Sequence, residues 1–352
     1  MIRNITFIKS AVYFLIVYLS FLVISSIYSS QRLSLTESKL DKSDTFFDSR
    51  ESLIANNENY RKGLEVNGEG NKEGALKLLT ESKKGAVSAG QKATVDFTIS
   101  TVVFDINRAS GTDAFIEISK NTNYPNRTRA LAMLRAYFLY VKFGDESLLK
   151  KLAVAYDITW TNPHEITLKY MNIVYNLYPF APAIIKIVEG KLDSTKNKEE
   201  GVAIFSKYKD EIIVSIKEMS QNNGELTETT SAMLGYSNLL GRMNLEFGGV
   251  TKKEVEDSYE SLINLDQLHN IQTNKQYTLI AYANFESGAK DYTKAESVLN
   301  MLLVREIHPA LKEALPKVDI KTKYPYLLIL KNNTKNEAIK SFIATIGSNY
   351  KK

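Results

Sequence analysis

Apolar residues recur at intervals of three and four positions along most of this chain. Leu148, Leu149 and Leu152 are one example, and this spacing places their side chains along one face of a helix. Runs of strictly alternating apolar and polar residues, which are typical of half-buried strands, are few. The pattern therefore predicts an all-α domain over residues 44–352.

The segment Thr94–Phe104 is the main challenge to this prediction, because it is rich in β-branched residues that favour strands. It lies between helical patterns, and no second strand that could pair with it is evident. We therefore expect this segment to form a buried helix.

Short breaks separate the expected helices. Asn162 followed by Pro163 is typical of an N-cap with proline at the first helical position. Thr251 and Glu254 have the spacing of a capping box ahead of another helix. Amphipathic helices joined by short turns bury their apolar faces against their sequence neighbours, either as a bundle or as a solenoid. The other clear breaks are Gly68–Asn71, Gly144–Asp145 and Gly248–Gly249.

The N-terminal segment Ser10–Tyr28 differs from the rest because it contains no charge and no proline. As a helix it would be about 28 Å long, close to the ~30 Å hydrocarbon thickness of a bilayer. We expect a transmembrane signal-anchor helix at 10–28, preceded by a short cytoplasmic tail (1–9) and followed by a spacer (29–43).

A cleaved signal peptide is the alternative, but the apolar stretch Ala11–Ile27 is longer than the about 7–15 residues typical of one. Arg3 and Lys9 precede the segment, whereas the basic residues that follow it lie further away among acidic ones. Because positive charge favours the cytoplasmic side, the bulk of the chain is expected outside the cytoplasm, in the periplasm or at the cell surface.

Three segments have features of tetratricopeptide repeats, in which units of about 34 residues form two helices packed through small and apolar residues. The matching residues are Leu279, Tyr282, Ala283, Ala295 and Leu299 in the clearest segment, Gly63, Val66, Ala75 and Leu79 in a second, and Tyr137, Tyr140, Leu149 and Ala153 in a third. The first departs from the pattern at Glu286, beside Phe285, where a later aromatic is expected.

The chain thus resembles tetratricopeptide-repeat-like (TPR-like) helical proteins with an N-terminal membrane anchor. The resemblance implies an α–α superhelix of antiparallel hairpins that mediates protein–protein interaction. An irregular helical domain is the structural alternative.

The residue inventory argues against several chemistries. The chain has no cysteine, which excludes disulfides, thiolate metal sites and cysteine nucleophiles. Its three histidines, His164, His269 and His308, are far apart in the sequence, so we expect no metal site. No phosphate-binding loop or catalytic signature is present, and we expect neither an enzyme nor a cofactor. Nucleic acid is not expected as a partner of an exported domain.

A concentration of aromatic residues between positions 124 and 180 is the best candidate for a binding site. Tyrosine and tryptophan combine a large apolar face with a polar tip, which suits grooves for peptides or sugars. Packing between helices explains the same spacing, so both interpretations stay open. The candidate groove residues are Tyr137, Tyr140, Tyr156, Trp160, Tyr170, Tyr175 and Tyr178.

Together these features predict a non-enzymatic, membrane-anchored helical-repeat scaffold that binds a protein or peptide partner in the cell envelope, as an assembly or accessory factor. The alternative is a surface-exposed helical protein that binds a small molecule or glycan in an aromatic-lined groove.

Overall fold

The computed structural model describes residues 46–221, 226–268 and 272–350, and within these ranges the protein is all-α with no strand. These described residues belong to one compact unit. Its helices, in chain order, are α2 (Phe46–Asn56), α3 (Glu58–Gly68), α4 (Lys72–Ser82), η1 (Lys83–Gly85), α5 (Ala89–Ile106), α6 (Arg108–Lys120), α7 (Asn126–Phe143), α8 (Glu146–Ala155), α9 (Pro163–Leu177), α10 (Ala181–Asp193), α11 (Lys198–Gln221), α12 (Leu226–Arg242), η2 (Met243–Phe247), α13 (Lys252–Leu268), α14 (Gln272–Gly288), α15 (Tyr292–Leu303), α16 (Pro309–Ala314), η3 (Leu315–Lys317), α17 (Ile320–Lys323), α18 (Pro325–Asn333) and α19 (Glu337–Thr345).

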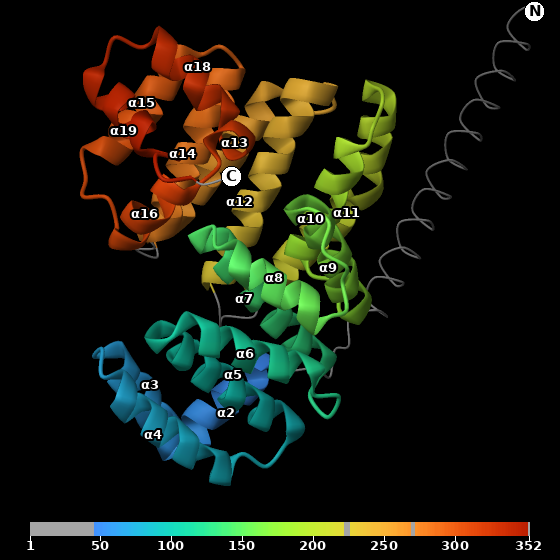
Figure 1. Cartoon of the computed structure of the whole chain (residues 1–352), viewed down its shortest axis with the longest axis vertical. Helices are drawn as coiled ribbons and strands as arrows, with labels where there is room; N and C mark the ends of the chain where they lie inside the picture. The colour runs from blue at the N-terminus through green and yellow to red at the C-terminus, as the bar shows by residue number, and fades with distance from the viewer. Residues whose placement is uncertain (1–45, 222–225, 269–271, 351–352) are drawn as a thin grey trace, which may run out of the picture. The chain divides into compact units, whose positions relative to one another are not determined.

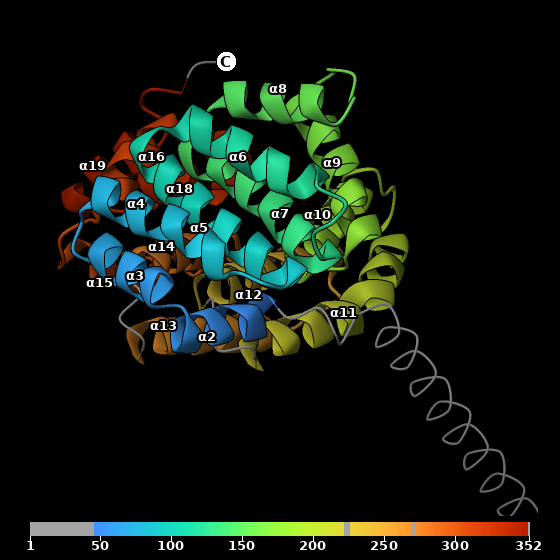
Figure 2. The ribbon, with the colours of Figure 1, turned by 90° about the horizontal axis from the view of Figure 1, so that it is seen from below.

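Successive helices are the main packing partners in this unit. The pairs α3–α4, α5–α6, α6–α7 and α14–α15 make the most extensive contacts. Figure 1 follows this order from α2 in blue to α19 in red. In the perpendicular view of Figure 2, α5, α6 and α7 again lie next to one another. Each apolar helix face is therefore covered mainly by the helices that precede and follow it.

The predicted buried helix at Thr94–Phe104 is confirmed as part of α5. Ser88 caps this helix through a reciprocal arrangement with Gln91, which satisfies free backbone N–H groups of the first turn. Val95 and Val102 are buried on the face that packs against the first helices. Tertiary packing thus outweighs the strand preference of the β-branched residues.

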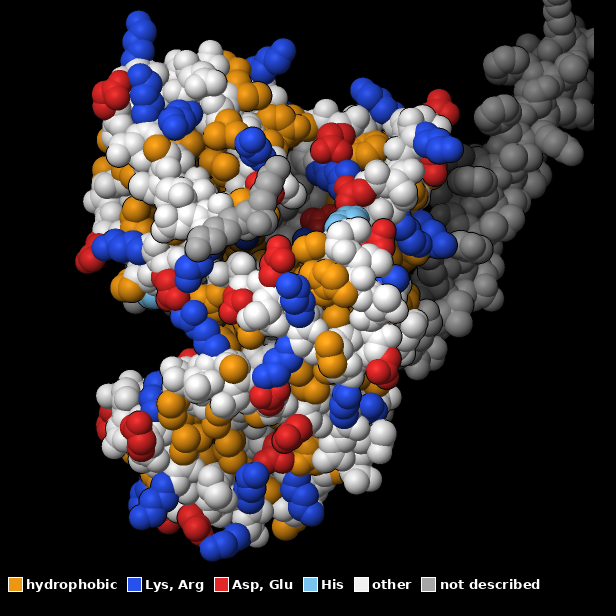
Figure 3. Space-filling model, viewed as in Figure 1, with side chains coloured by type: hydrophobic (Ala, Val, Ile, Leu, Met, Phe, Trp, Pro, Cys, Tyr) orange, Lys and Arg blue, Asp and Glu red, His pale blue; other side chains and the backbone are white. Residues whose placement is uncertain are grey.

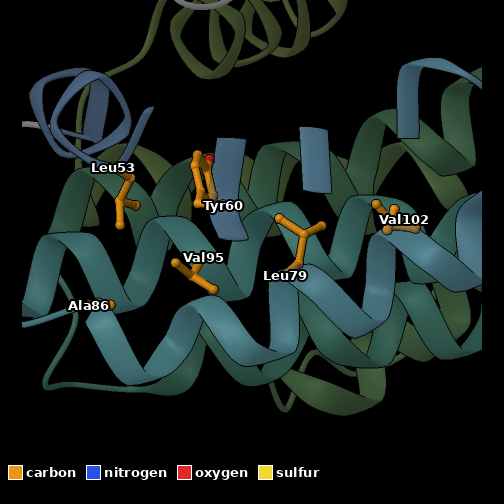
Figure 4. Packing of buried hydrophobic residues seen from close by; sticks show 7 residues of the cluster. Leu53, Tyr60, Leu79, Ala86, Val95 and Val102 are labelled. Carbon is orange, nitrogen blue, oxygen red and sulfur yellow. The ribbon is translucent and has the colours of Figure 1, made fainter. Parts of the chain in front are cut away.

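The N-terminal helices share one core, in which buried side chains from α2 to α5 meet (Figure 4). Leu53, Tyr60, Leu79 and Val95 contribute to it and are each 1 % exposed or less. The Tyr60 hydroxyl lies 2.9 Å from Oγ1 of Thr98, so this buried phenol keeps a hydrogen-bond partner.

The predicted helix caps are also confirmed. The Asn162 side chain accepts a hydrogen bond of 3.0 Å from the backbone N–H of Glu165, with Pro163 at the first helical position. Thr251 and Glu254 exchange the two hydrogen bonds of a capping box, of 2.8 and 3.3 Å. Local signals therefore placed these two helix starts correctly.

The three segments that resemble tetratricopeptide repeats each form a pair of helices joined by a short turn, α3–α4, α7–α8 and α14–α15. Their small and apolar signature residues lie in the contacts between helices. Those with 5 % exposure or less include Ala75, Leu79, Tyr137, Leu149, Ala153, Leu279, Tyr282, Ala283, Ala295 and Leu299. Glu286, the departure from the pattern, is fully buried, and one of its carboxylate oxygens lies 3.0 Å from Nζ of Lys252.

Small residues let neighbouring helices approach closely at two points. A Cβ atom on Gly63 would lie 2.8 Å from Cγ of Leu79, across the α3–α4 pair. A Cβ atom on Gly111 would lie 2.3 Å from Cα of Phe104, in the backbone of α5. Because backbone cannot move aside as a side chain does, Gly111 fixes the distance between α5 and α6.

The C-terminal part of the unit returns to its N-terminal half. Arg108 on α6 forms an ion pair of 2.7 Å with Glu313 on α16, across more than two hundred residues of sequence. Helix α16 also contacts α7. The end of the described chain is held on η3, where the N–H of Gly347 donates to the carbonyl of Leu315 at 2.8 Å.

One buried carboxylate is poorly satisfied. Asp266 on α13 is 1 % exposed, its Oδ1 has no hydrogen-bond partner, and its Oδ2 lies 3.5 Å from the hydroxyl of Thr278. Burial raises the pKa of Asp266 to about 7, although the Thr278 hydroxyl and the charge of Lys275 act in the opposite direction.

The predicted membrane anchor at 10–28, its flanking tail and its spacer lie outside the described residues. Among the residues that the structure describes, no helix has the length and apolarity needed to cross a bilayer.

Gly111→Ala is expected to lower the free energy of unfolding by about 1–3 kcal/mol, because the new methyl group overlaps the backbone of α5. Gly68→Ala is the control, because a Cβ atom there meets nothing within 4 Å. Urea denaturation of both variants measures the difference. Equal stability of the two variants would show that the α5–α6 contact tolerates a larger separation.

Asp266→Asn is expected to stabilise the protein at pH 8 by about 2–4 kcal/mol, and the gain is expected to disappear as the pH falls towards 4. Between 3.8 and about 7 the native Asp266 keeps a proton that the unfolded chain has released. The free energy of unfolding of the unmodified protein therefore falls as the pH rises through this window.

Thermal or urea denaturation across this pH range measures the effect. Asp257→Asn is the matched control on the same helix, since its carboxylate is 57 % exposed and pairs with Lys253 at the surface. A gain in stability from Asp266→Asn that does not change with pH would contradict the raised pKa of Asp266.

Candidate binding surface

Three of the candidate tyrosines form a packed seam between α7, α8 and α9. The Tyr137 and Tyr170 rings stack at 6.2 Å between centroids with an interplanar angle of 27°. The Tyr156 ring meets Tyr170 edge-on, at 5.2 Å and 80°. These are the offset and edge-to-face geometries that aromatic pairs prefer, and they join three successive helices.

The polar tips of this seam are satisfied inside the protein. The hydroxyl of Tyr170, which is fully buried, donates to the carbonyl of Met133 at 2.9 Å. The hydroxyl of Tyr156 forms a short hydrogen bond with Ser119 on α6. Burial raises the pKa of both phenols, so they stay neutral. Tyr137 and Tyr170 are therefore inaccessible to a ligand in this conformation.

The remaining candidate tyrosines lie in different surroundings. Tyr178 is 4 % exposed and packs on Phe180 at 4.7 Å, so it also belongs to the core. Tyr175 is half-buried and donates to Glu211 on α11 at 3.0 Å; burial, followed by that carboxylate, raises its pKa to about 12. Tyr140 is half-buried next to Tyr137, with 5.8 Å between ring centroids.

Trp160 is separate from the tyrosine seam. It lies in the segment between α8 and α9, keeps 37 % of its surface exposed, and has the Nζ of Lys150 at 5.3 Å from its ring. This distance is within the range of a cation–π interaction. The structure therefore does not gather the seven candidate residues in one groove: Tyr137, Tyr156 and Tyr170 form the seam, Tyr178 belongs to the core, Tyr140 and Tyr175 are half-buried, and Trp160 faces solvent.

A surface hollow of about 510 Å³ lies between α6 and α8, beside Lys150. Its floor is mostly apolar and includes Ile116 and Ala155, and Val154 at its edge is 79 % exposed. One side is fixed by the ion pair between Lys151 and Asp113, at 2.6 Å. We call this feature the α6–α8 hollow.

The charge around the hollow is mixed. Lys150 forms no ion pair with any described residue, whereas Lys151 is neutralised by Asp113. Figure 3 shows that Lys and Arg side chains alternate with Asp and Glu over the visible face of the molecule, with apolar patches between them. Binding of a partner at this surface would therefore depend on individual side chains, because the surface does not carry a large electrostatic potential of one sign.

Sequence reasoning included Trp160 but missed the hollow beside it. One signal was available, because Val154 is a large apolar residue outside the buried stripe formed by Leu148, Leu149 and Leu152. The contribution of Ile116 could not be inferred, since it comes from another helix.

The described residues contain no group of three or more histidine, aspartate or glutamate side chains arranged to hold a metal ion. His164 on α9 instead faces Asp193 at the end of α10 at 3.1 Å, and the other oxygen of Asp193 pairs with Arg242 at 2.7 Å.

Comparison of the chain with protein-family models, with curated proteins and with solved structures gives no match.

Tyr170→Phe is expected to lower the free energy of unfolding by about 1 kcal/mol, because the buried hydroxyl loses its hydrogen bond to Met133 while the ring contacts stay. Tyr175→Phe is the control, since its hydroxyl meets Glu211 in a half-buried position, and a smaller loss is expected there. Chemical denaturation of the two variants provides the comparison, and a larger loss for Tyr175→Phe would contradict it.

Proposed function

We propose that this chain is a membrane-anchored scaffold whose stacked helical hairpins bind a protein partner in the cell envelope. The apolar segment at 10–28 supports the anchor. The three helix pairs that carry tetratricopeptide-like residues support a solenoid-like stacking of hairpins. Such stacking presents a large, rigid surface, which is suited to interaction rather than to catalysis.

The observation that carries this proposal is the exposed apolar surface of the α6–α8 hollow. Val154 leaves most of its side chain in water at the edge of the hollow, and Lys150, which also lines the hollow, lies over the Trp160 ring. Covering such surface removes it from water, at about 25 cal/mol per Å² of apolar area. Tryptophan is also enriched among the residues that dominate binding energy in protein interfaces.

The chemistry of the rim indicates which kind of segment would bind. Lys150 has no acidic partner among the described residues and already lies over the Trp160 ring. A partner segment with an apolar side chain followed by a carboxylate would fill the hollow and pair with Lys150. In this proposal the hollow therefore binds a segment of the partner protein that contains both apolar and acidic residues.

Val154→Asp is expected to reduce partner capture at least about fivefold without loss of folding, because the side chain is exposed and the new charge opposes an acidic segment. Crosslinking in intact membranes, followed by affinity purification and quantitative mass spectrometry, measures capture. Val87→Asp is the matched control, with 80 % exposure at a site outside the hollow.

Equal capture by both variants and the unmodified protein would rule out the α6–α8 hollow as the docking surface. Recovery of lipid adducts alone, with no crosslinked protein, would overturn the scaffold function itself. Trp160 is the only tryptophan of the chain, so its fluorescence reports directly whether a purified partner covers this surface.

A further inference from the structure

A second surface hollow, of about 350 Å³, lies where α11, α12 and α13 meet. Its volume falls within the ~300–1,000 Å³ that is typical of small-molecule sites. Helix α11 contributes Lys209 to its lining, and α12 contributes Tyr236 and Leu240, which are four residues apart and so share one face of that helix. The remaining wall is formed by α13. We call this feature the α11–α13 hollow.

The α13 wall of the hollow is polar, whereas a separate stripe of the same helix is buried. Glu254, Asp257 and Ser261 follow one another at intervals of three and four residues, so they lie on the same face of α13. Ser258 shares this face, and its Oγ lies 2.6 Å from that of Ser237 on α12, which fixes the wall against the neighbouring helix. The buried stripe consists of Val255, Tyr259 and Leu262. Because this stripe provides the packing of α13, the polar face is left open towards the hollow.

Among the described residues, each carboxylate of this wall is bonded through only one of its two oxygens. Oε2 of Glu254 accepts hydrogen bonds from the backbone N–H of Thr251 at 2.8 Å and from its hydroxyl at 2.7 Å. Oδ1 of Asp257 accepts from Nζ of Lys253 at 3.1 Å. Each side chain is thus held in place through one oxygen and can accept a hydrogen bond from a ligand through the other.

The α12 wall supplies a phenol group. Tyr236 is half-buried, and its hydroxyl forms no hydrogen bond with a residue that the structure describes. Burial, followed by the charge of Glu254, raises the pKa of Tyr236 to about 12, so the hydroxyl keeps its proton at neutral pH. This group can therefore donate a hydrogen bond to a ligand.

The α11 wall supplies an ammonium group. Lys209 makes no ion pair within the described ranges, and its Nζ lies 6.0 Å from the centre of the Phe205 ring on the same helix. Hydrogen bonds from Thr251, and to a lesser degree the charge of Lys209, lower the pKa of Glu254. Lys209 thus lies near enough to act on this carboxylate but does not pair with it, which leaves the ammonium donors for a ligand.

The combination of donors, acceptors and apolar surface indicates the chemistry of the ligand. A lysine accompanies each of the two carboxylates, Lys209 and Lys253, so the charges balance and the hollow favours neither a cation nor an anion. Hydroxyl groups match such a lining, because each of them can both donate and accept a hydrogen bond. Leu240 and the Tyr236 ring add an apolar surface that suits the C–H face of a sugar ring.

We propose that the α11–α13 hollow binds a neutral saccharide. Tyr236 and Leu240 pack against its carbon ring. Glu254 and Asp257 accept hydrogen bonds from its hydroxyl groups, and Lys209 donates to one of its oxygens. The helices of this site are not those of the α6–α8 hollow, so the proposal does not depend on the scaffold function.

Saturation-transfer NMR of the full-length chain in lipid nanodiscs tests this site, with empty nanodiscs as the blank. The probes are four neutral disaccharides: maltose, cellobiose, lactose and N,N′-diacetylchitobiose. At least one of them is expected to show transfer, strongest at the C–H groups of one sugar ring. Glucosamine and glucuronate, which carry a positive and a negative charge, are expected to bind more weakly because the charges around the hollow balance.

Transfer to a single disaccharide supports the site and identifies the sugar that it prefers. Absence of transfer to all four disaccharides overturns the proposal. Stronger binding of either charged sugar overturns it as well, because the proposal rests on the balance of charges in the lining.

Two conservative variants locate the bound disaccharide. Asp257→Asn is expected to raise its dissociation constant about tenfold, because a charge-assisted hydrogen bond becomes a neutral one. The matched control is Asp105→Asn, whose carboxylate is 43 % exposed and pairs with Lys72 outside the hollow.

Tyr236→Phe keeps the ring but removes the hydroxyl, and is expected to raise the dissociation constant about fivefold. Tyr277→Phe is its control, because Tyr277 on α14 is also half-buried but does not line the hollow. Binding that both hollow variants leave unchanged, or that the two controls weaken equally, places the saccharide elsewhere and overturns the proposal.

Discussion

The burial of one apolar face of each helix against its sequence neighbours is the constraint on which this structure depends. No strand occurs in the described residues to provide an alternative surface, so the helices cover one another, mostly as sequence neighbours and in places across the fold, as α14 and α18 do. Close approaches such as Gly111 against Phe104 and Gly63 against Leu79 keep these contacts tight. Interior packing at this density leaves little freedom for neighbouring helices to separate.

A few carboxylates are buried in this core, where their removal from water is energetically unfavourable. Glu286 is fully buried beside Lys252, which also reaches Asp291 at 2.8 Å and thereby ties α13 to the α14–α15 turn. Asp266 has no comparable partner, and its raised pKa reflects that deficit. The two carboxylates lie on adjacent helices, yet only one of them is paired with a cation. Burial nevertheless raises the pKa of both carboxylates, so the ionised form of each is disfavoured in the α13–α14 contact even though Glu286 lies beside Lys252.

The aromatic residues illustrate how the same residue type serves packing and binding. Tyr137 and Tyr170 are held inside the seam by the stacking of their rings, and the Tyr170 hydroxyl donates a hydrogen bond to the protein backbone. Tyr277 and Tyr324 lie within cation–π distance of the exposed Lys323. Trp160 remains partly in water. Exposed apolar area, rather than aromatic content alone, distinguishes the candidate binding surface at the α6–α8 hollow from the core.

The amino-acid sequence by itself determined the helical class of the domain and many of its local features. Helix periodicity, the Asn162 and Thr251 caps, and the small residues of the helix pairs all act between residues close in sequence, so they could be inferred without coordinates. The same reasoning placed Thr94–Phe104 correctly in a helix, because no strand partner existed for it. The anchor at 10–28 stays a prediction from the sequence.

Only the tertiary structure decided which aromatic residues are buried and where the α6–α8 hollow lies. These features depend on contacts between helices that are not neighbours in the sequence, such as α7 with α9 and α7 with α16, and on the return marked by the Arg108–Glu313 ion pair. Residue spacing carries no information about such contacts, because it describes the face of one helix and not the helix that covers it.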